Sequence, residues 1–371
     1  MSTDTQLPNE LRQVLEEYVT PVDPITPEGA VEKFIAGEKG DLAPNTVDEY
    51  ERKLEWLIDF CELNSIEDTS EFDASMLHDY RIWRRDETNV RGGSLSRKTM
   101  KDDMYVLRKF LRFLEGINAV NPGLHETVEI PSLKPGEGVR DDELPSERVE
   151  SILNYLQKYE YATREHAVWV LLAATGRRPG GLRSLDCEDM HLDTERPYIE
   201  FENREEDGTR LKNGDKSDTM VALRDKPAEI LRDYLETNRV DIEDENGRSP
   251  VLSSPYGRLA TSTIRNYVYK WSRPCMIGED CPIDRDPSEC QAMESTDHAS
   301  KCPSSKPPYA LRHGYISDLR RRGVSISTIS DRVDASEKII KEVYSELTEE
   351  EKLELRRAEL EANSDATGGY L

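Results

Sequence analysis

The stretch Pro308-Tyr309-Ala310-Leu311-Arg312-His313-Gly314-Tyr315 decides which fold we expect for this chain of 371 residues. Its pattern predicts a helix that carries Arg312, and one short helical hairpin later the chain reaches Tyr344. An arginine can hold a phosphate group through two parallel hydrogen bonds, and a tyrosine hydroxyl can attack it. Such a site needs further cationic partners, and the earlier part of the chain contains candidates.

A second cationic motif follows a predicted apolar helix at residues 166–174. It reads Thr175-Gly176-Arg177-Arg178-Pro179-Gly180-Gly181-Leu182-Arg183-Ser184-Leu185. Beyond it, residues 198–201 and 220–223 predict the two strands of a hairpin, with Lys212-Asn213-Gly214-Asp215-Lys216 in the turn region between them. The segments at residues 175–185 and 212–216, which both precede Pro308, therefore offer cationic side chains.

In this order and spacing, the motifs resemble those of the tyrosine recombinase (phage integrase) family, in a halophilic archaeal type. The resemblance runs from about Thr26 to Glu346. It implies a mainly α fold with a small β-sheet, in which an N-terminal helical core-binding domain precedes an α+β catalytic domain. It also implies a site-specific DNA recombinase or integrase that works on double-stranded DNA as a homotetramer. Such enzymes cut and rejoin DNA through a covalent 3'-phosphotyrosine intermediate.

The resemblance gives residues of this chain the family's catalytic positions. Arg178 takes the place of the first catalytic arginine, Arg312 that of the second, and Tyr344 that of the nucleophile. Lys212 takes the place of the hairpin lysine, with Lys216 as the alternative. Two arginine forks can stabilise the charge added at phosphorus, and a lysine can protonate the leaving oxygen. This chemistry requires no metal or nucleotide cofactor.

The chain departs from the family pattern at three positions. Gly181 stands where an acidic residue is usual, and Tyr309 replaces the histidine of the His-x-x-Arg motif. The second His or Trp position falls on Ala335, or on Asp334 if the register shifts by one. These positions orient the phosphate and assist proton transfer, so we expect slower chemistry. Tyr309 can still donate a hydrogen bond, and His313 beside Arg312 can compensate in part.

Composition shifts and breaker residues predict the domain organisation. The N-terminal domain should contain helices that begin after Thr26, Asp73 and Ser96 and one from Asn45 to about Leu63. We expect an N-terminal arm at 1–25, a helical DNA-binding domain at 26–118, a linker at 119–145, the catalytic domain at 146–348 with a Cys-rich insertion at 273–304, and a C-terminal tail at 349–371.

A basic stretch at residues 91–101 connects the helix that begins after Asp73 to the helix that begins after Ser96. Its glycines and helix start are typical of segments that contact phosphates, although an ordinary solvated loop explains the charges equally well. The candidate DNA-contacting residues are Arg84, Arg91, Arg97, Lys98 and Lys101.

The chain has 75 acidic and 50 basic residues and a formal net charge of -25. Taken alone, this charge argues against a nucleic-acid partner. A halophilic cytoplasm offers another explanation, because molar salt shortens the Debye length to about 3 Å and leaves only local basic patches to act. No apolar run or signal-peptide pattern stands out, so we expect a cytoplasmic protein with no membrane partner.

Four of the six cysteines lie close together in the sequence, as Cys275-x5-Cys281-x8-Cys290-x11-Cys302, with His298 between the last two. Most of this segment lacks apolar periodicity, and ligation of one structural zinc ion would order it. The expected ligands are Cys275, Cys281, Cys290 and either His298 or Cys302. Free or redox-active thiols in a loop are the alternative interpretation.

Two other functions agree with the sequence. One is a DNA-binding or regulatory protein that kept the fold and lost the chemistry through its replaced histidines. The other is a relaxing, type IB-like topoisomerase, because the same phosphotyrosine chemistry can reseal its own strand. For the tail, the pattern of residues 349–362 predicts an amphipathic helix that packs on the protein or on a neighbouring protomer.

Overall fold

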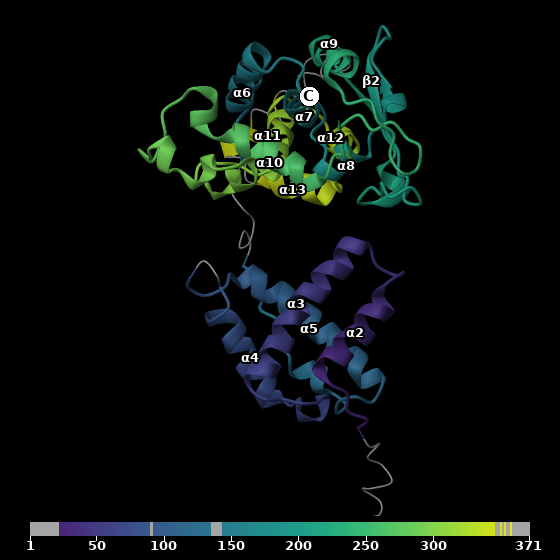
Figure 1. The fold of residues 1–371 in the computed structure, drawn as a ribbon, viewed down its shortest axis with the longest axis vertical. Coiled ribbons are helices and arrows are strands. Elements are labelled where there is room, and N and C mark those ends of the chain that lie inside the picture. Colours follow the sequence, from purple (N-terminus) through teal and green to yellow (C-terminus); the bar gives the residue numbers. More distant parts are fainter. Residues whose placement is uncertain are drawn as a thin grey trace, which may run out of the picture. The chain divides into compact units, whose positions relative to one another are not determined.

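The computed structural model describes residues 22–89, 92–134 and 143–345 and, near the C-terminus, 349–350, 352–353 and 357. The chain divides into two compact units, Met1–Arg140 and Asp141–Leu371, and each is described by itself. The described residues are mainly helical with a small sheet, which confirms the predicted fold class (Figure 1). Within them, no helix is both long and apolar enough to cross a membrane.

The described part of the N-terminal unit is a bundle of helices. The bundle contains α2 (Pro27–Glu38), α3 (Pro44–Leu63), α4 (Ala74–Asp86) and α5 (Arg97–Gly116), with the short turns η1 (Thr69–Glu71) and η2 (Leu124–Thr127). The side chains of Thr26, Asp73 and Ser96 each accept a backbone hydrogen bond at a helix start, as the sequence predicted. These caps satisfy N–H groups that have no partner inside the helix.

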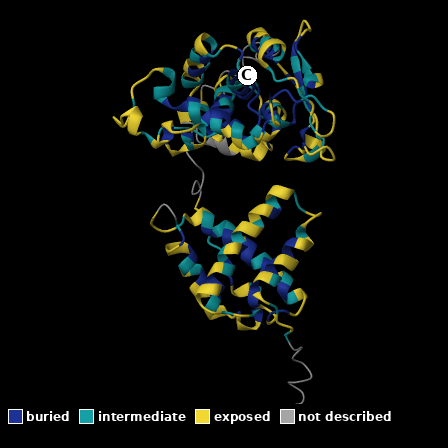
Figure 2. Cartoon of the chain, in the orientation of Figure 1, coloured by how far each residue is buried: buried dark blue, intermediate teal, exposed yellow. Residues whose placement is uncertain are grey.

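Apolar faces of these helices meet in a shared core, while the outer faces are exposed (Figure 2). The rings of Phe34 and Phe110 meet edge to face, with centroids 5.5 Å apart. The buried hydroxyl of Thr69 accepts from the N–H of Ile25 at 3.2 Å and donates to the carbonyl of Ala119 at 2.6 Å. The hydroxyl therefore ties the start of the unit to the loop after α5.

Helices also dominate the C-terminal unit. They are α6 (Ser146–Tyr159), α7 (Arg164–Thr175), α8 (Pro179–Ser184), α9 (Asp225–Asp233) with the π-helical turn η5 (Tyr234–Asn238), α10 (Thr261–Ser272), α11 (Pro308–Arg321), α12 (Ile326–Val333) and α13 (Glu337–Ser345). The sequence did not indicate α8, because six residues are too few to show a helical period. Helix α7 is buried along most of its length and forms the centre of the core.

An antiparallel sheet of order β1-β2-β3 lies beside these helices. Its strands are β1 (Met190–His191), β2 (Tyr198–Phe201) and β3 (Thr219–Ala222), and a separate hairpin pairs β4 (Ser253–Ser254) with β5 (Gly257–Arg258). Ile199 pairs with Val221, which confirms the predicted β2–β3 hairpin. The connection between these two strands contains the short turn η4 (Gly214–Ser217).

Arg258 fixes the end of α8 from the side of the β4–β5 hairpin. Its guanidinium donates to the carbonyls of Arg183 at 2.9 Å and Leu185 at 3.2 Å. It also pairs with the carboxylates of Asp244, at 2.7 Å, and Asp186, and its side chain is 6% exposed. The paired charges of this network satisfy each other where water is excluded, and they hold α8 in position.

Two glycines allow the close packing around α11. Gly176 ends α7 in the left-handed region with φ +66°, and a Cβ placed there would lie 2.3 Å from Cδ1 of Tyr315 on α11. A Cβ at Gly314 would lie 2.1 Å from the backbone oxygen of Leu144. The glycine in each motif is therefore required by contact between distant segments.

Gly176→Ala should lower the free energy of unfolding by at least about 2 kcal/mol. Alanine is strained in the left-handed backbone conformation, and its Cβ would overlap the ring of Tyr315. The matched control is Gly180→Ala on α8, where a Cβ meets nothing within 4 Å. That variant should stay within about 0.5 kcal/mol of the wild type or be stabilised. Denaturant unfolding of both variants measures the difference, and equal effects would contradict the packing described here.

His166 on α7 gives the C-terminal unit a pH dependence. Its buried Nδ1 accepts from the N–H of Ala162 at 3.2 Å, and burial, with Lys226 adding to the effect, lowers the pKa of His166 from 6.5 to about 4. Between pH 6.5 and about 4, His166 binds a proton in the unfolded chain but stays neutral in the folded chain. The stability contribution is therefore complete above pH 6.5 and is lost as the pH falls towards 4.

The free energy of unfolding should consequently fall less steeply between pH 6.5 and 4 in His166→Gln than in the wild type, because glutamine does not titrate. Chemical unfolding at a series of pH values measures both slopes. Parallel slopes would show that His166 does not cause the acid sensitivity.

Candidate active site

Arg177 and Arg178 follow Gly176 but have different surroundings. Arg177 is 2% exposed, and its Cζ atom lies 4.4 Å from the ring centroid of Phe201. Its guanidinium donates to three backbone carbonyls, those of Ser217, Asp331 and Arg332. Arg177 therefore joins η4 to α12, and Arg178 is the arginine of this pair that remains for chemistry.

Arg178, which directly precedes α8, and Arg312, on α11, converge on Asp334. Nη1 of Arg178 donates to the backbone carbonyl of Asp334 and, at 3.2 Å, to its carboxylate oxygen Oδ2. Nη2 of Arg312 donates to the same carbonyl at 3.2 Å. Its Nη1 donates to the carbonyls of Gly176, at 2.9 Å, and Val333. The structure thus brings the two predicted catalytic arginines together at one oxygen atom.

Asp334 reaches both arginines from the end of α12. It has φ 53° and ψ 63°, a left-handed conformation that aspartate adopts more readily than most residues. Its Oδ1 accepts from the side-chain amide of Asn213 at 2.7 Å, and its Oδ2 lies 3.9 Å from Nη1 of Arg177. One carboxylate is therefore shared by the two adjacent arginines and the hairpin connection.

The cluster carries more positive than negative charge in a poorly solvated place. Burial, and then the positive charge of Arg178, lower the pKa of Arg312 to about 9, although Asp334 opposes the shift. Burial likewise lowers the pKa of Arg178, again against the effect of Asp334. Low solvation and mutual repulsion disfavour both cations, and an added anion would relieve the repulsion. This is the electrostatic condition of a site that binds a phosphate group.

The lysine candidates lie beside this cluster, in the connection between β2 and β3. Lys212 is exposed and directly precedes Asn213, whose amide contacts Asp334. Lys216 is also exposed and lies on η4. Both lysines belong to the segment that borders the arginines, so the choice of Lys212 with Lys216 as the alternative stays a prediction.

Tyr344 lies near the end of α13, and its side chain falls outside the described residues. The helix contacts both α11 and α12. Ile340 of α13 is buried together with Ile329 and Val333 of α12. The backbone of α13 is thereby attached to the two helices that carry Arg312 and Asp334, and the role of Tyr344 stays a prediction.

Two family models match this chain. The model of the phage integrase family matches residues 142–280, and the model of the phage integrase N-terminal SAM-like domain matches residues 33–116. The chain belongs to the phage integrase family. The first match includes Arg178 and Lys212 and ends before Tyr309, Arg312 and Tyr344. No curated protein matches the chain.

Solved integrases share the fold at low sequence identity. The Tn1549 transposon integrase, in complex with transposon right end DNA, is 15% identical with a TM-score of 0.60, over 92% of this chain and 100% of that one. A lambda integrase dimer bound to a COC' core site is 11% identical with a TM-score of 0.59, over 92% and 82% of the two chains. A lambda integrase tetramer bound to a Holliday junction is 12% identical with a TM-score of 0.54, over 91% and 83%.

The positions at which this integrase departs from the family pattern differ in their surroundings. Tyr309 is 46% exposed at the start of α11, and its ring centroid lies 5.8 Å from that of His313. His313 itself is buried, with Nδ1 4.0 Å from a carboxylate oxygen of Glu143. Ala335 is buried in the small apolar cluster that also contains Ile340. Of the two registers considered for the second His position, Asp334 is the residue that reaches the arginines.

Sequence reasoning missed the parts that Asp334 and Asn213 play here. Gly181, at the position usually acidic, lies against Arg177 and Phe201, where a Cβ would be 3.7 Å from each. Gly181 has no carboxylate, and Asp334 places one beside Arg177 and Arg178. An aspartate that follows a predicted helix is a weak signal, because such residues are common at helix ends.

The structure contradicts the prediction that Arg84 contacts DNA. Arg84 is 6% exposed, and its Nη2 lies 2.8 Å from Oδ2 of Asp103. Its Cζ lies 4.5 Å from the ring centroid of Trp56. Burial raises the pKa of Asp103, and Arg84 opposes that shift. Arg84 is therefore a core residue of the bundle, and contact with a phosphate would break its buried ion pair.

The other DNA-contact candidates gather at the start of α5. Arg97 and Lys98 are exposed in the first turn, and Lys101 is half-buried one turn later. Lys98 lies 2.7 Å from the carboxylate of Asp102, an exposed pair that contributes little to stability. Arg91 lies outside the described residues. The surviving candidates stay predictions.

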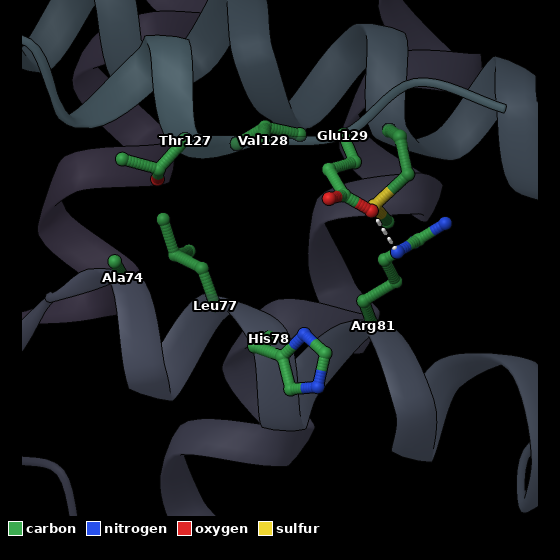
Figure 3. A pocket seen from close by; sticks show the side chains of 8 residues that line it. Ala74, Leu77, His78, Arg81, Thr127, Val128 and Glu129 are labelled. Carbon is green, nitrogen blue, oxygen red and sulfur yellow. Dashed lines mark hydrogen bonds and ion pairs between the residues drawn. The ribbon is translucent and has the colours of Figure 1, made fainter.

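A pocket of about 80 Å³ lies in the N-terminal unit, where α4 faces residues 127–129 (Figure 3). Arg81 and Glu129 form an ion pair of 2.6 Å at its edge, and His78 lines it. The charges of this pair neutralise each other. The pocket therefore lacks the excess positive charge that distinguishes the arginine cluster of the C-terminal unit.

The insertion holds the predicted metal ligands. Cys275, Cys281, Cys290 and Cys302 line one small cavity, whereas His298 pairs with Glu294 at 2.9 Å. Burial raises the pKa of the Cys275 thiol. The charges of the other three cysteines raise this pKa further, whereas Arg273 opposes the shift.

Asp334→Asn should lower the free energy of unfolding by roughly 1 to 3 kcal/mol at low salt, because the arginines lose their shared carboxylate while the left-handed turn is kept. Molar salt should reduce this loss only slightly, because charges in a poorly solvated cluster are screened much less than exposed ones. Asp331→Asn, an exposed position of α12, is the control and should have little effect. Urea unfolding at both salt concentrations measures the effect, and equal losses in the two variants would contradict it.

Proposed function

We propose that this integrase is a site-specific DNA recombinase that cuts and rejoins double-stranded DNA. The observation that carries the proposal is the convergence of Arg178 and Arg312 on the single carbonyl oxygen of Asp334. Two guanidinium groups, held by buried carbonyls and short of negative charge, suit a phosphodiester whose charge grows during attack. The similar solved proteins are complexes with DNA, which supports DNA as the substrate.

In the proposed reaction, the oxygen of Tyr344 bonds to the phosphorus of a DNA strand and loses its proton to water. The bond from phosphorus to the 5'-oxygen breaks, and Lys212 or Lys216 protonates that leaving oxygen. The 3'-phosphotyrosine formed conserves the bond energy, so that a 5'-hydroxyl of the same or another strand can reverse the step. Arg178 and Arg312 bind the non-bridging oxygens throughout, and Tyr309 offers a further hydrogen bond from its exposed position.

The phosphate would replace Asp334 as the partner of the arginines. Because Arg178 already binds the carbonyl and the carboxylate of Asp334, and Arg312 binds the same carbonyl, DNA binding would have to move this turn or share the guanidinium groups with it. The end of α12 would then shift together with α13, which follows directly. Such a coupling would connect phosphate binding to the position of Tyr344.

We further propose that the protein acts as a homotetramer in a halophilic cytoplasm. The lambda integrase tetramer bound to a Holliday junction shares this fold, which supports a homotetramer on two duplexes here. The net charge of -25 supports a halophilic cytoplasm as the working environment. Strand transfer should therefore be measured at low and at multimolar salt.

A regulatory DNA-binding protein is the second candidate. The observation in its favour is Ala335, which is 5% exposed among apolar side chains and can neither donate nor accept a proton. Tyr309 does not replace a histidine as a base. A protein of this kind would bind its DNA site with equal strength whether or not Tyr344 keeps its hydroxyl.

Tyr344→Phe should abolish the covalent adduct that the wild type forms with nicked duplexes from the DNA flanking its gene, while DNA affinity stays within about twofold. The control is Tyr256→Phe, which removes a hydroxyl from a side chain that is 98% exposed. Denaturing gels detect the adduct. A wild type that binds its site at both salt concentrations without any adduct would support the regulatory protein instead.

Arg178→Ala and Arg312→Ala should each slow adduct formation about 100- to 1000-fold. Arg196→Ala, at an exposed position in the loop between β1 and β2, is the control and should stay near the wild-type rate. Single-turnover cleavage measures the rates. Near-normal cleavage by either arginine variant, with its fold verified by unfolding, would remove the arginine cluster from the mechanism.

A further inference from the structure

The Cys-rich insertion between α10 and α11 is built with little apolar material. Its regular structure consists of short turns: η6 (Pro274–Ile277), η7 (Pro287–Glu289), η8 (Gln291–Met293) and η9 (Thr296–Lys301). Ala292 and Ala299 are the small apolar residues buried there, together with Cys302. Burial of such small side chains contributes little free energy, so the segment needs another source of order.

Four cysteines from separate segments line a single cavity of about 20 Å³. Cys275 lies in η6, Cys281 and Cys290 lie between turns, and Cys302 follows η9, so that one bound atom would connect the whole insertion. All four thiols are free, with no disulfide among them. A cavity of this size accommodates one small ion or water molecule.

We propose that Cys275, Cys281, Cys290 and Cys302 bind one structural zinc ion. Zinc in closed structural sites takes four tetrahedral ligands, and four thiolates form one of its common ligand sets. In the described parts of the chain, no three His, Cys, Asp or Glu side chains already stand in a metal-binding arrangement. Each cysteine has one side-chain torsion with three staggered positions, and zinc binding would require the four sulfurs to turn into the cavity that they line.

The charges around the cavity suit this ligand set. One zinc ion and four thiolates carry a net charge of minus two, and Arg273 and Arg285 both line the cavity. Arg273 is 3% exposed and is held in place by a hydrogen bond to the carbonyl of Ala292. A fixed buried cation stabilises thiolates and lowers the cost of placing their charge in a poorly solvated site.

His298 is excluded from the ligand set by its position. It is absent from the cavity lining, and its Nδ1 lies 2.9 Å from the carboxylate of Glu294. Cys302 lines the cavity and is 9% exposed. The cavity lining therefore favours Cys302 over His298 as the fourth ligand of the proposed site.

The metal would hold the start of α11, the helix of Tyr309 and Arg312. Cys302 lies six residues before Pro308, the first residue of that helix. Between them, the N–H of Lys306 donates to the hydroxyl of Ser272 at the end of α10, at 2.7 Å. Zinc would therefore fix both ends of the insertion and the helix start without touching a reacting atom.

The test uses the full chain purified under reducing conditions with zinc supplied. Elemental analysis should find one zinc ion per chain, and cobalt substitution should give the thiolate-to-cobalt charge-transfer band and the visible bands of a tetrahedral site. Cys290→Ser should weaken zinc binding at least about 100-fold in competition with a chelator. His298→Ala and Cys187→Ser are the controls, and both should bind zinc as the wild type does.

Wild-type protein without bound zinc, or cobalt spectra without thiolate bands, would overturn the proposal even if Cys290→Ser fails to fold. Loss of zinc from His298→Ala would overturn the ligand set. Mass spectrometry that finds a disulfide within the insertion, in protein from the same preparation, would do the same. None of these readouts depends on DNA cleavage, so they are independent of the proposed function.

Discussion

The meeting of Arg178 and Arg312 at the carbonyl of Asp334 is the contact on which the arrangement of the predicted catalytic residues depends. Two poorly solvated cations repel each other, and the backbone carbonyls and the one carboxylate that contact them offset this repulsion. Those acceptors come from the ends of α7 and α12. The packing of these two ends therefore determines the site more directly than the helix that bears Arg312.

A second set of contacts holds those two ends together. Arg332 of α12 donates to the hydroxyl of Tyr315 at 2.5 Å and to the carbonyl of Ala174 at 2.7 Å. The same Tyr315 ring fills the space that a side chain at Gly176 would need. Gly176, Tyr315 and Arg332 thus form one set of packing contacts. Residues that look like parts of a catalytic signature can therefore owe their identity to packing.

Local chemistry in the sequence predicted much of the fold, because caps, breakers and apolar periods act over a few residues. Thr26 caps α2 and Ser96 caps α5, as expected. Contacts between distant residues were out of reach. Arg84 looked like a surface cation because its partner Asp103 lies on another helix, and Asp334 looked like a shifted histidine position because nothing nearby in sequence reveals its arginines.

The acidic composition and the proposed phosphate-binding site can coexist because their charges act over different distances. At molar salt, exposed charges separated by more than about 3 Å hardly interact, so a net charge of -25 does not repel DNA as it would in dilute buffer. Buried charges are screened much less. Arg312 is 6% exposed, and its hydrogen bonds to a phosphate would keep most of their strength. In the proposed site, a phosphate would then compete with the carbonyl of Asp334 for Arg312 and with its carboxylate for Arg178, more than with the acidic surface.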